Sequence, residues 1–234
     1  MSQSPVSSLK YRIRPGTFFD VRAVTEIYAS AFSTEPLIDF LFPTRRQDPV
    51  SFYTWAYRRM QCRYWTLGYS LTVVADEHDY PCYRGSYLPV SSFVPRLSSV
   101  SDMTEIAFWV GPIMNAFTAI RNYIYPAHGL NEGNVEISKK AFAAVEPHVL
   151  DTPRRQKAQY LSLLAVDPIL QGQGLGQMLL EHDLRRVDEE DSAVWLVSLA
   201  NLEKFYSRHG FAETVKVEME GLENWKGGMA MLRD

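Results

Sequence analysis

Cysteine is scarce in this chain of 234 residues, which contains only Cys62 and Cys82. Two cysteines cannot form a metal site by themselves, and they permit at most one disulfide; we expect two free thiols in a reducing compartment. The first ten residues are polar and rich in serine, so they do not have the pattern of a secretory signal. These features predict a cytoplasmic protein.

Long hydrophobic runs and an excess of either charge are also lacking. The longest apolar stretch, 106–120, is interrupted by Gly111 and Pro112 and is shorter than the roughly 20 residues of a membrane span. We therefore expect no membrane insertion. Lys and Arg number 24 against 27 Asp and Glu, a net charge of −3, so nucleic acid is not expected as a partner. An anionic ligand must be held locally, by backbone amides or a few side chains.

The remaining composition is that of a globular protein, with 46% hydrophobic and 22% charged residues. We expect one domain over 1–234, with the proline- and serine-rich residues 80–103 as an irregular insertion. Aromatic residues crowd between 53 and 69. Core packing is the simpler interpretation of this crowding, and the walls of an apolar ligand pocket are the alternative.

Apolar periodicity predicts alternating strands and helices. Strands are expected over 11–14, 71–75, 106–110, 160–166, 193–197, 213–219 and 225–232, the last with a bulge at Gly227-Gly228. Helices are expected over 21–32, 51–65, 113–125, 135–145, 175–187 and 201–208, with a loop over 33–46.

The segment 171–176, Gln-Gly-Gln-Gly-Leu-Gly, lies between a buried strand and a helix. Such a turn can bind a phosphate, because free N–H groups and the positive end of the helix dipole point at it. A dinucleotide fingerprint would need its third glycine at 177, which is Gln177, and the sequence has no Gly-Lys-Ser/Thr. The spacing excludes both of these phosphate loops. A tight connection without a ligand is the remaining alternative.

Gln171, Gly174 and Gly176 fit the pattern Gln/Arg-x-x-Gly-x-Gly/Ala directly after a strand. This resembles the pyrophosphate loop of the GNAT superfamily of N-acetyltransferases. The flanks 164–168 and 205–211 are similar to the family's segments at these distances, the second to its Leu-Tyr-x-x-x-Gly-Phe segment. The first strand and helix, 13–32, are similar to those of GNAT proteins, especially fungal ones, so we expect a fungal-type member.

The resemblance implies a fold and a cofactor. The fold is α/β (α+β), a mixed, mostly antiparallel central sheet flanked by helices on both faces, with a V-shaped cleft for CoA. The pantetheine of CoA would pair with the main chain of Leu164, Ala165 and Val166, and no metal is implied. The implied contacts to the rest of acetyl-CoA are Gln171, Gly172, Gln173, Gly174, Leu175, Gly176, Asn201 and Tyr206. Lys204 and Arg208 would lie at the adenosine end, or are solvated surface charges.

The implied reaction is direct transfer of an acetyl group from acetyl-CoA to an amine in a ternary complex. The amine must lose a proton and the CoA thiolate must gain one. Tyr206 stands where many members use a tyrosine to protonate the thiolate; a core tyrosine is the alternative.

The general base is less defined. Tyr160 and Ser162 lie near the position of the family's glutamate, and Val197 stands where related fungal sequences often have Glu. Glu35, Asp39 and His128 are further candidates, and a water chain is another solution. We take Tyr206, Glu35 and Ser162 as the catalytic candidates.

The acceptor and the oligomeric state are not defined by the sequence. The aromatic segment 52–69 favours a partly apolar small-molecule amine, while a polyamine, a peptide N-terminus and a lysine stay open. Two other functions also stay open. One is a GNAT-fold enzyme that uses another acyl-CoA or a reaction without transfer, and the other is a CoA-binding regulatory module without turnover.

Overall fold

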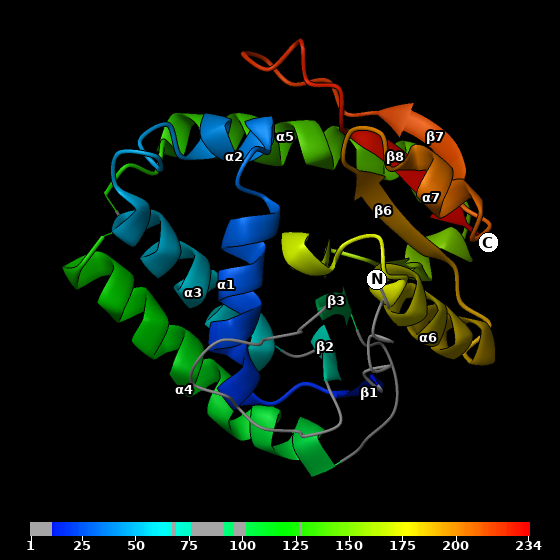
Figure 1. Ribbon diagram of the computed structural model, residues 1–234, viewed down its shortest axis with the longest axis horizontal. Coiled ribbons are helices and arrows are strands. Elements are labelled where there is room, and N and C mark those ends of the chain that lie inside the picture. Colours follow the sequence, from blue (N-terminus) through cyan, green and yellow to red (C-terminus); the bar gives the residue numbers. More distant parts are fainter. Residues whose placement is uncertain (1–10, 67–68, 76–90, 96–101, 127) are drawn as a thin grey trace, which may run out of the picture.

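The computed structural model describes residues 11–66, 69–75, 91–95, 102–126 and 128–234 (Figure 1). Its strands are β1 (Arg12–Pro15), β2 (Tyr69–Ala75), β3 (Ser91–Pro95), β4 (Gln159–Tyr160), β5 (Leu163–Ala165), β6 (Val194–Ser198), β7 (Ala212–Lys216) and β8 (Met229–Arg233). Its α-helices are α1 (Val21–Ala31), α2 (Pro36–Leu41), α3 (Pro49–Trp65), α4 (Asp102–Ile124), α5 (Glu132–Val149), α6 (Leu175–Glu189) and α7 (Glu203–Ser207), and its short 3-10 turns are η1 (Phe18–Asp20), η2 (Arg155–Lys157) and η3 (Pro168–Leu170).

Within the described residues, the strands form two four-stranded sheets. The first has the order β1-β2-β3-β5 and is antiparallel throughout. The second has the order β4-β6-β8-β7, and only β4 and β6 in it are parallel. The mixed, mostly antiparallel sheet expected from the sequence is therefore confirmed.

The segment 159–165 joins the two sheets. Its first part, β4, pairs with β6, and the N–H of Leu161 still donates to the carbonyl of Trp195 at 2.9 Å. Two residues later the chain is β5, which pairs with β3. The strand thus changes partner along its length, and the two sheets separate between β5 and β6.

Alternating side chains along the strands explain why helices cover both faces. In β6, Val194 and Leu196 pack with Leu180 of α6, whereas Trp195 packs with Val145 of α5. The first sheet is similar: Val73 faces the cluster formed by α1 and α3, and Val74 packs against the start of α6. Figure 1 shows α1, α3 and α5 on one side of the strands and α6 on the other.

Asp20 joins β1 to α1. Asp20 occupies the N-cap position of α1, but its carboxylate makes no cap hydrogen bond to that helix. It instead accepts two hydrogen bonds from Arg14, at 2.8 and 2.9 Å, and one from the N–H of Thr17 at 2.7 Å. Burial opposes ionisation of Asp20, but the bonds from Arg14 and Thr17 outweigh it and lower the pKa of this carboxyl group.

The expected strand at 106–110 is wrong, because these residues lie within α4. A short apolar run is compatible with either a buried strand or a helix. Here it continues through Gly111 and Pro112 into 113–124 as one helix.

The expected irregular insertion at 80–103 is wrong for residues 91–95, which form β3 between β2 and β5 in the first sheet. It is also wrong for residues 102 and 103, which begin α4. Residues 80–90 and 96–101 lie outside the described residues. The expected loop 33–46 also contains a helix, α2, which has Pro36 at its first turn and Glu35 as its N-cap.

At the carboxyl end, the expected strand 225–232 begins only at Met229. The irregular register lies on β7, between Glu213 and Val215, so a bulge at Gly227-Gly228 is also wrong. None of the helices in the part of the chain that is described combines the length and apolar character needed to cross a membrane.

Candidate active site

The glycine loop 171–176 presents its main chain outward. Gly172 and Gly174 have φ of +78° and +82°, in the left-handed region where a side chain costs free energy. A Cβ built on either residue meets nothing within 4 Å. Backbone conformation, and not crowding, therefore requires glycine here, and the outer side of the turn is open.

The N-terminus of α6 adds amide donors to this turn. Gly174 is its N-cap and no side chain caps it. The N–H of Met178 is bonded to the carbonyl of Gly174 at 2.9 Å. The preceding N–H groups of the first turn have no carbonyl within the helix to bind. With the positive end of the helix dipole, they form a site suited to a diphosphate.

The start of α6 is held firmly against the sheet. Leu175 is 3% exposed and packs with Val74 and Leu179. A Cβ on Gly176 would lie 3.3 Å from Cγ2 of Val166, so helix and strand end approach closely. Of the predicted CoA contacts, Leu175 can therefore contribute its N–H but not its side chain.

Gln171 has a local partner. Its Nε2 donates to the carbonyl of Val166 at 3.1 Å, while Gln173 is exposed. This bond joins the glycine loop to the end of the strand that precedes it. The carbonyl of Val166, part of the main chain expected to meet pantetheine, thus accepts one hydrogen bond from the loop.

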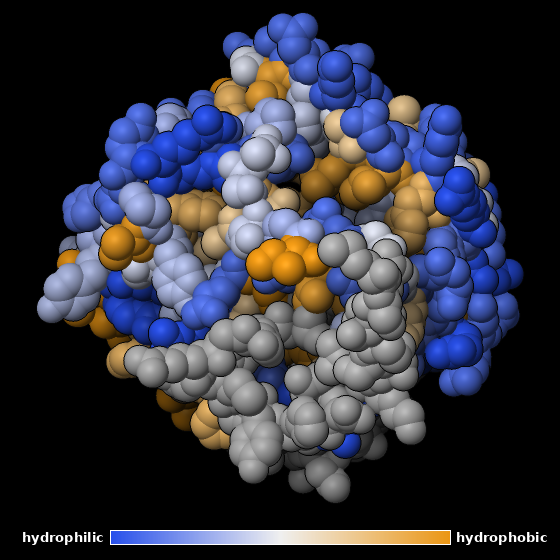
Figure 2. All heavy atoms as spheres, in the orientation of Figure 1, coloured by the Kyte–Doolittle hydropathy of each residue, from blue (hydrophilic) through white to orange (hydrophobic). Residues whose placement is uncertain are grey.

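The cleft follows from the separation of β5 and β6. Leu164 and Val166 are half-buried on the α6 side, whereas Ala165 is buried on the α1 side. Figure 2 shows a hollow near the centre of this face, with hydrophobic side chains at its back, between α1 and β6 in the view of Figure 1.

Tyr206 and Asn201 follow the carboxyl end of β6. Tyr206, on α7, is 7% exposed and packs with Leu161 and Phe211. Burial, and to a smaller extent the neighbouring Tyr160, raise the pKa of Tyr206 far above its ordinary value, so its hydroxyl keeps its proton. Asn201 is exposed, with φ of +66°, in the turn between β6 and α7.

Ser162 and Tyr160 lie where the sheet divides. Ser162 is half-buried at the step between β4 and β5. Tyr160 packs on Trp195, with ring centroids 4.4 Å apart. Burial raises the pKa of Tyr160, opposed by the positive charges of Arg63 and Arg59.

Glu35 is oriented by two donors. Its Oε1 accepts from the N–H of Leu37 at 3.4 Å and from Nε1 of the buried Trp225 at 2.7 Å. Just beyond Trp225, the N–H of Gly228 donates to the carbonyl of Ser198, the last residue of β6. Glu35 thus faces the segment that runs beside the end of β6, the same end from which Asn201 and Tyr206 follow.

The other candidate bases are placed less favourably. Asp39 binds Nε of Arg45 at 2.6 Å and Nη2 of Arg46 at 2.9 Å. The hydrogen bond from Arg45 is the main reason that the pKa of Asp39 is lowered. His128 is exposed. The two residues expected at the adenosine end of CoA, Lys204 and Arg208, are exposed at α7.

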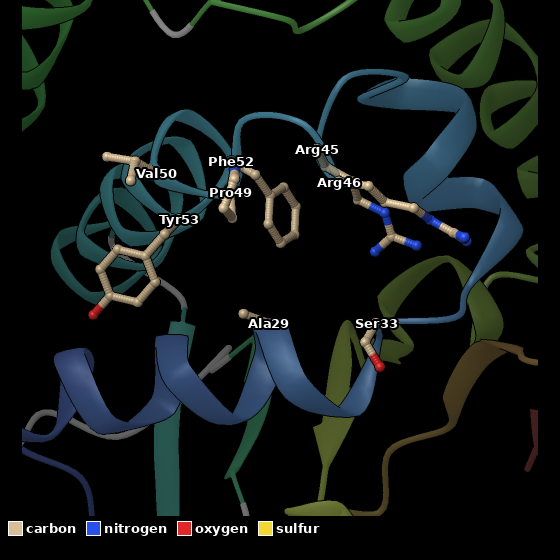
Figure 3. Close-up of a pocket in the computed structure, with 8 residues that line it drawn as sticks. All are labelled: Ala29, Ser33, Arg45, Arg46, Pro49, Val50, Phe52 and Tyr53. Atoms are coloured by element: carbon tan, nitrogen blue, oxygen red, sulfur yellow. The ribbon is translucent and has the colours of Figure 1, made fainter.

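A cavity of about 500 Å³ lies between α1 and the start of α3 (Figure 3). Phe52 and Tyr53 of the aromatic segment belong to its wall, while Trp55, Tyr57 and Tyr64 pack against the core cluster of α1 and α3. Most of the aromatic crowding is therefore core packing. The lining comes from α1, α3 and the chain between them, and the glycine loop does not contribute; the lining residues are Ala29, Ser33, Arg45, Arg46, Pro49, Val50, Phe52 and Tyr53.

A divided sheet with a glycine turn and a bare helix N-terminus beside the division is the architecture that the GNAT resemblance implies. Residues 140–231 match the family model of the acetyltransferase (GNAT) domain. This range includes the glycine loop, Asn201 and Tyr206. No curated protein sequence matches the chain.

Several solved structures have a similar fold. Histone acetyltransferase HPA2 and related acetyltransferase from Corynebacterium glutamicum has a TM-score of 0.59 at 14% identity, over 96% of each chain. The ribosomal-protein-S18-alanine N-acetyltransferase from Escherichia coli has 0.50 at 14%, over 96% of this chain and 93% of that one. The GCN5-related N-acetyltransferase from Rhodopseudomonas palustris has 0.50 at 11%, over 100% and 99%.

The chain therefore has the fold of the GNAT acetyltransferases, and residues 140–231 are similar to their domain in sequence. The expected affinity to fungal members is not supported by these matches.

Proposed function

We propose that this protein transfers an acetyl group from acetyl-CoA to an amine of a small-molecule acceptor. The observation that carries the proposal is the uncapped N-terminus of α6, with its open glycine turn, directly beside the place where β5 and β6 separate. The match of residues 140–231 to an acetyltransferase domain supports an acyl-CoA as the ligand of this turn.

The CoA site follows from these groups. The diphosphate lies against the amides of Gln171 to Gly176, and Leu164, Ala165 and Val166 provide main chain for pantetheine. Asn201 and Tyr206 contact CoA from the end of β6. Because Gln171 and Gln173 are neutral, backbone dipoles supply most of the attraction for the diphosphate.

Tyr206 acts on the leaving group. The amine nitrogen attacks the thioester carbonyl, the C–S bond breaks, and the sulfur gains a proton. An ordinary thiol has a pKa of about 8.5, well below the raised pKa of Tyr206. Tyr206 therefore stabilises the developing thiolate by donating a hydrogen bond and keeps its own proton. The proton that the sulfur gains comes from solvent, and the proton that the amine loses balances it.

Glu35 is the proposed base, and Ser162 the proposed hydroxyl beside the reacting carbonyl. The bond from Trp225 fixes one oxygen of Glu35 and so orients the carboxylate. A weakly basic acceptor, such as an arylamine, would need this base less. The cytoplasmic location and the extent of the domain over 1–234 stay predictions.

The test is release of free thiol from acetyl-CoA with a panel of aryl, alkyl and amino-acid amines, together with mass spectrometry of the product. We expect thiol release that depends on the amine and a product heavier by one acetyl group. The control variant Asp167→Asn changes a residue that caps η3 next to the loop, and should leave release unchanged.

Two outcomes favour the alternatives. Release with a longer acyl-CoA but not with acetyl-CoA would favour another acyl donor. Binding of CoA by calorimetry without release from any donor and amine would favour a regulatory module. Both of these measurements are needed because a carboxylate that is common in related enzymes is absent here. Its positions are taken by the neutral residues Tyr160, Ser162 and Val197.

A further inference from the structure

Helix α4 exposes an apolar face. Of its residues from 112 to 124, the exposed ones are apolar or aromatic with one exception, Asn122. Ile113, Phe117, Ile120 and Ile124 are each 56–68% exposed, and Tyr123 is 89% exposed. Figure 2 shows hydrophobic side chains along the margin where Figure 1 places α4. An exposed apolar helix face of this kind is typical of a site that binds another molecule.

The opposite side of α4 is firmly attached to α3. Arg121 donates to Oε1 of Gln61 at 2.8 Å, and Arg58 donates to Oδ1 of Asn122 at 3.1 Å. A Cβ on Gly111 would lie 2.5 Å from the carbonyl oxygen of Trp65, so the two helices touch at their backbones. The orientation of α4 is therefore set by α3, and the apolar face is directed outward by that packing.

The exposed residues follow the spacing of a coiled-coil seam. Ile113, Phe117, Ile120 and Ile124 are separated by four, three and four residues, which is the alternation of a and d positions. From 112 to 124 Arg121 is the single charged residue. It donates to Gln61, and its guanidinium carbon also lies 6.0 Å from the centre of the Phe117 ring. The seam positions themselves carry no charge, so no like charges meet between two identical seams.

The area of the face is sufficient for a dimer. Aromatic side chains bury about 150–250 Å² each, so the exposed fractions of Phe117, Tyr123 and Tyr125 amount to roughly 400 Å². The isoleucines, with about 60–70% of their surface exposed, bring the total to roughly 700 Å². Standard interfaces bury about 600–1,000 Å² per partner, and this area lies within that range, whereas the largest patch of a typical monomer is about 300–600 Å².

We propose that α4 is the interface of a homodimer, in which the α4 helices of two copies pack antiparallel across a two-fold axis. A two-fold axis between residues 118 and 119 would place Phe117 against Ile120 of the other copy and Ile113 against Ile124. Antiparallel packing also aligns the helix dipoles favourably. This inference is independent of the acetyl-transfer reaction.

Sedimentation equilibrium of the full chain at 5–100 µM tests the proposal. We expect a mass about twice the 26.8 kDa of one chain. Phe117→Glu and Ile120→Lys should each give a monomer, because each buries like charges or an unpaired charge in the seam. The double variant should recover the dimer, since antiparallel packing brings the introduced carboxylate of one copy beside the introduced ammonium of the other.

The control is Asn122→Asp, which adds a charge to the same helix away from the seam and keeps an acceptor for Arg58; it should stay dimeric. Circular dichroism melting of each variant shows that it is folded. A monomeric wild type, or a folded Phe117→Glu variant that stays dimeric, would overturn the proposal. A monomer whose binding to phosphatidylcholine vesicles is lost in Phe117→Glu would overturn it in favour of a lipid surface.

Discussion

The indole N–H of Trp225 donates to Oε1 of Glu35 at 2.7 Å, and this bond joins residues 190 positions apart. It connects the N-cap of α2 to the segment that enters β8. Because Trp225 is buried, the bond is shielded from water, and Glu35 has both a structural and a proposed catalytic role. The two roles can be separated by substitution.

Glu35→Gln keeps an amide oxygen for Trp225 and for the N–H of Leu37 but cannot take a proton. We expect its melting temperature to change by less than about 3 °C, and its kcat to fall about 100-fold or more, the usual contribution of a general base. Melting curves and thiol release measure the two effects.

Trp225→Phe is the matched control, since it removes the donor and leaves the carboxylate. It should cost roughly 1 kcal/mol of stability and retain more activity than Glu35→Gln. Full activity in Glu35→Gln would show that this glutamate is not the base.

Tyr206→Phe removes the hydroxyl and retains the ring that packs with Leu161 and Phe211. We expect kcat to fall about 10- to 100-fold, while the Kd for CoA changes little, because the variant loses a bond formed mainly as the C–S bond breaks. Stopped-flow thiol release and calorimetry give the two values. Tyr28→Phe, another buried tyrosine with a raised pKa, should leave both unchanged. Equal losses in the two variants would contradict a special role for Tyr206.

Gly174→Ala places a side chain at φ of +82°, which costs about 1–2 kcal/mol and disturbs the turn that precedes α6. We expect the Kd for CoA to rise about 10-fold in calorimetry. Gly210→Ala is the control, because it places a side chain on a backbone with a similar φ of +86° but lies outside the loop. It should lower the stability of the protein without this loss of affinity for CoA. Unchanged CoA binding in Gly174→Ala would place the diphosphate elsewhere.

Asp39→Asn breaks the pair with Arg45, a residue that is 5% exposed. We expect a loss of about 2 kcal/mol at pH 7, less than for a fully buried pair because the Asp39 side chain is 35% exposed and partly screened by water. Urea unfolding measures the loss.

The pH dependence of this effect has a defined sign. The pKa of Asp39 is lowered in the folded state, so its stabilisation is complete above the unfolded value of about 3.9 and is lost as the pH falls through the folded pKa. The stability difference between wild type and Asp39→Asn should therefore be constant from pH 7 to 5 and shrink towards pH 2. A difference that grows on acidification would contradict the pair.

Local chemistry was readable from the sequence alone. The glycines between 171 and 176 predicted a turn after the strand, and the apolar spacing after Leu175 predicted α6; both are present. These features depend on neighbours within a few residues, for which periodicity and glycine conformational freedom are reliable physical signals. The GNAT resemblance of residues 160–211 rested on the same local pattern.

Tertiary structure decided what depends on distant partners. Ser91–Pro95 becomes a strand because β2 and β5 supply its hydrogen bonds, and 106–110 becomes helix as part of a longer element on α3. The change of partner after Leu161 and the bond from Trp225 to Glu35 likewise join segments far apart in the chain. A local residue pattern does not predict such long-range pairings, because each one stabilises the fold only after both segments have come together.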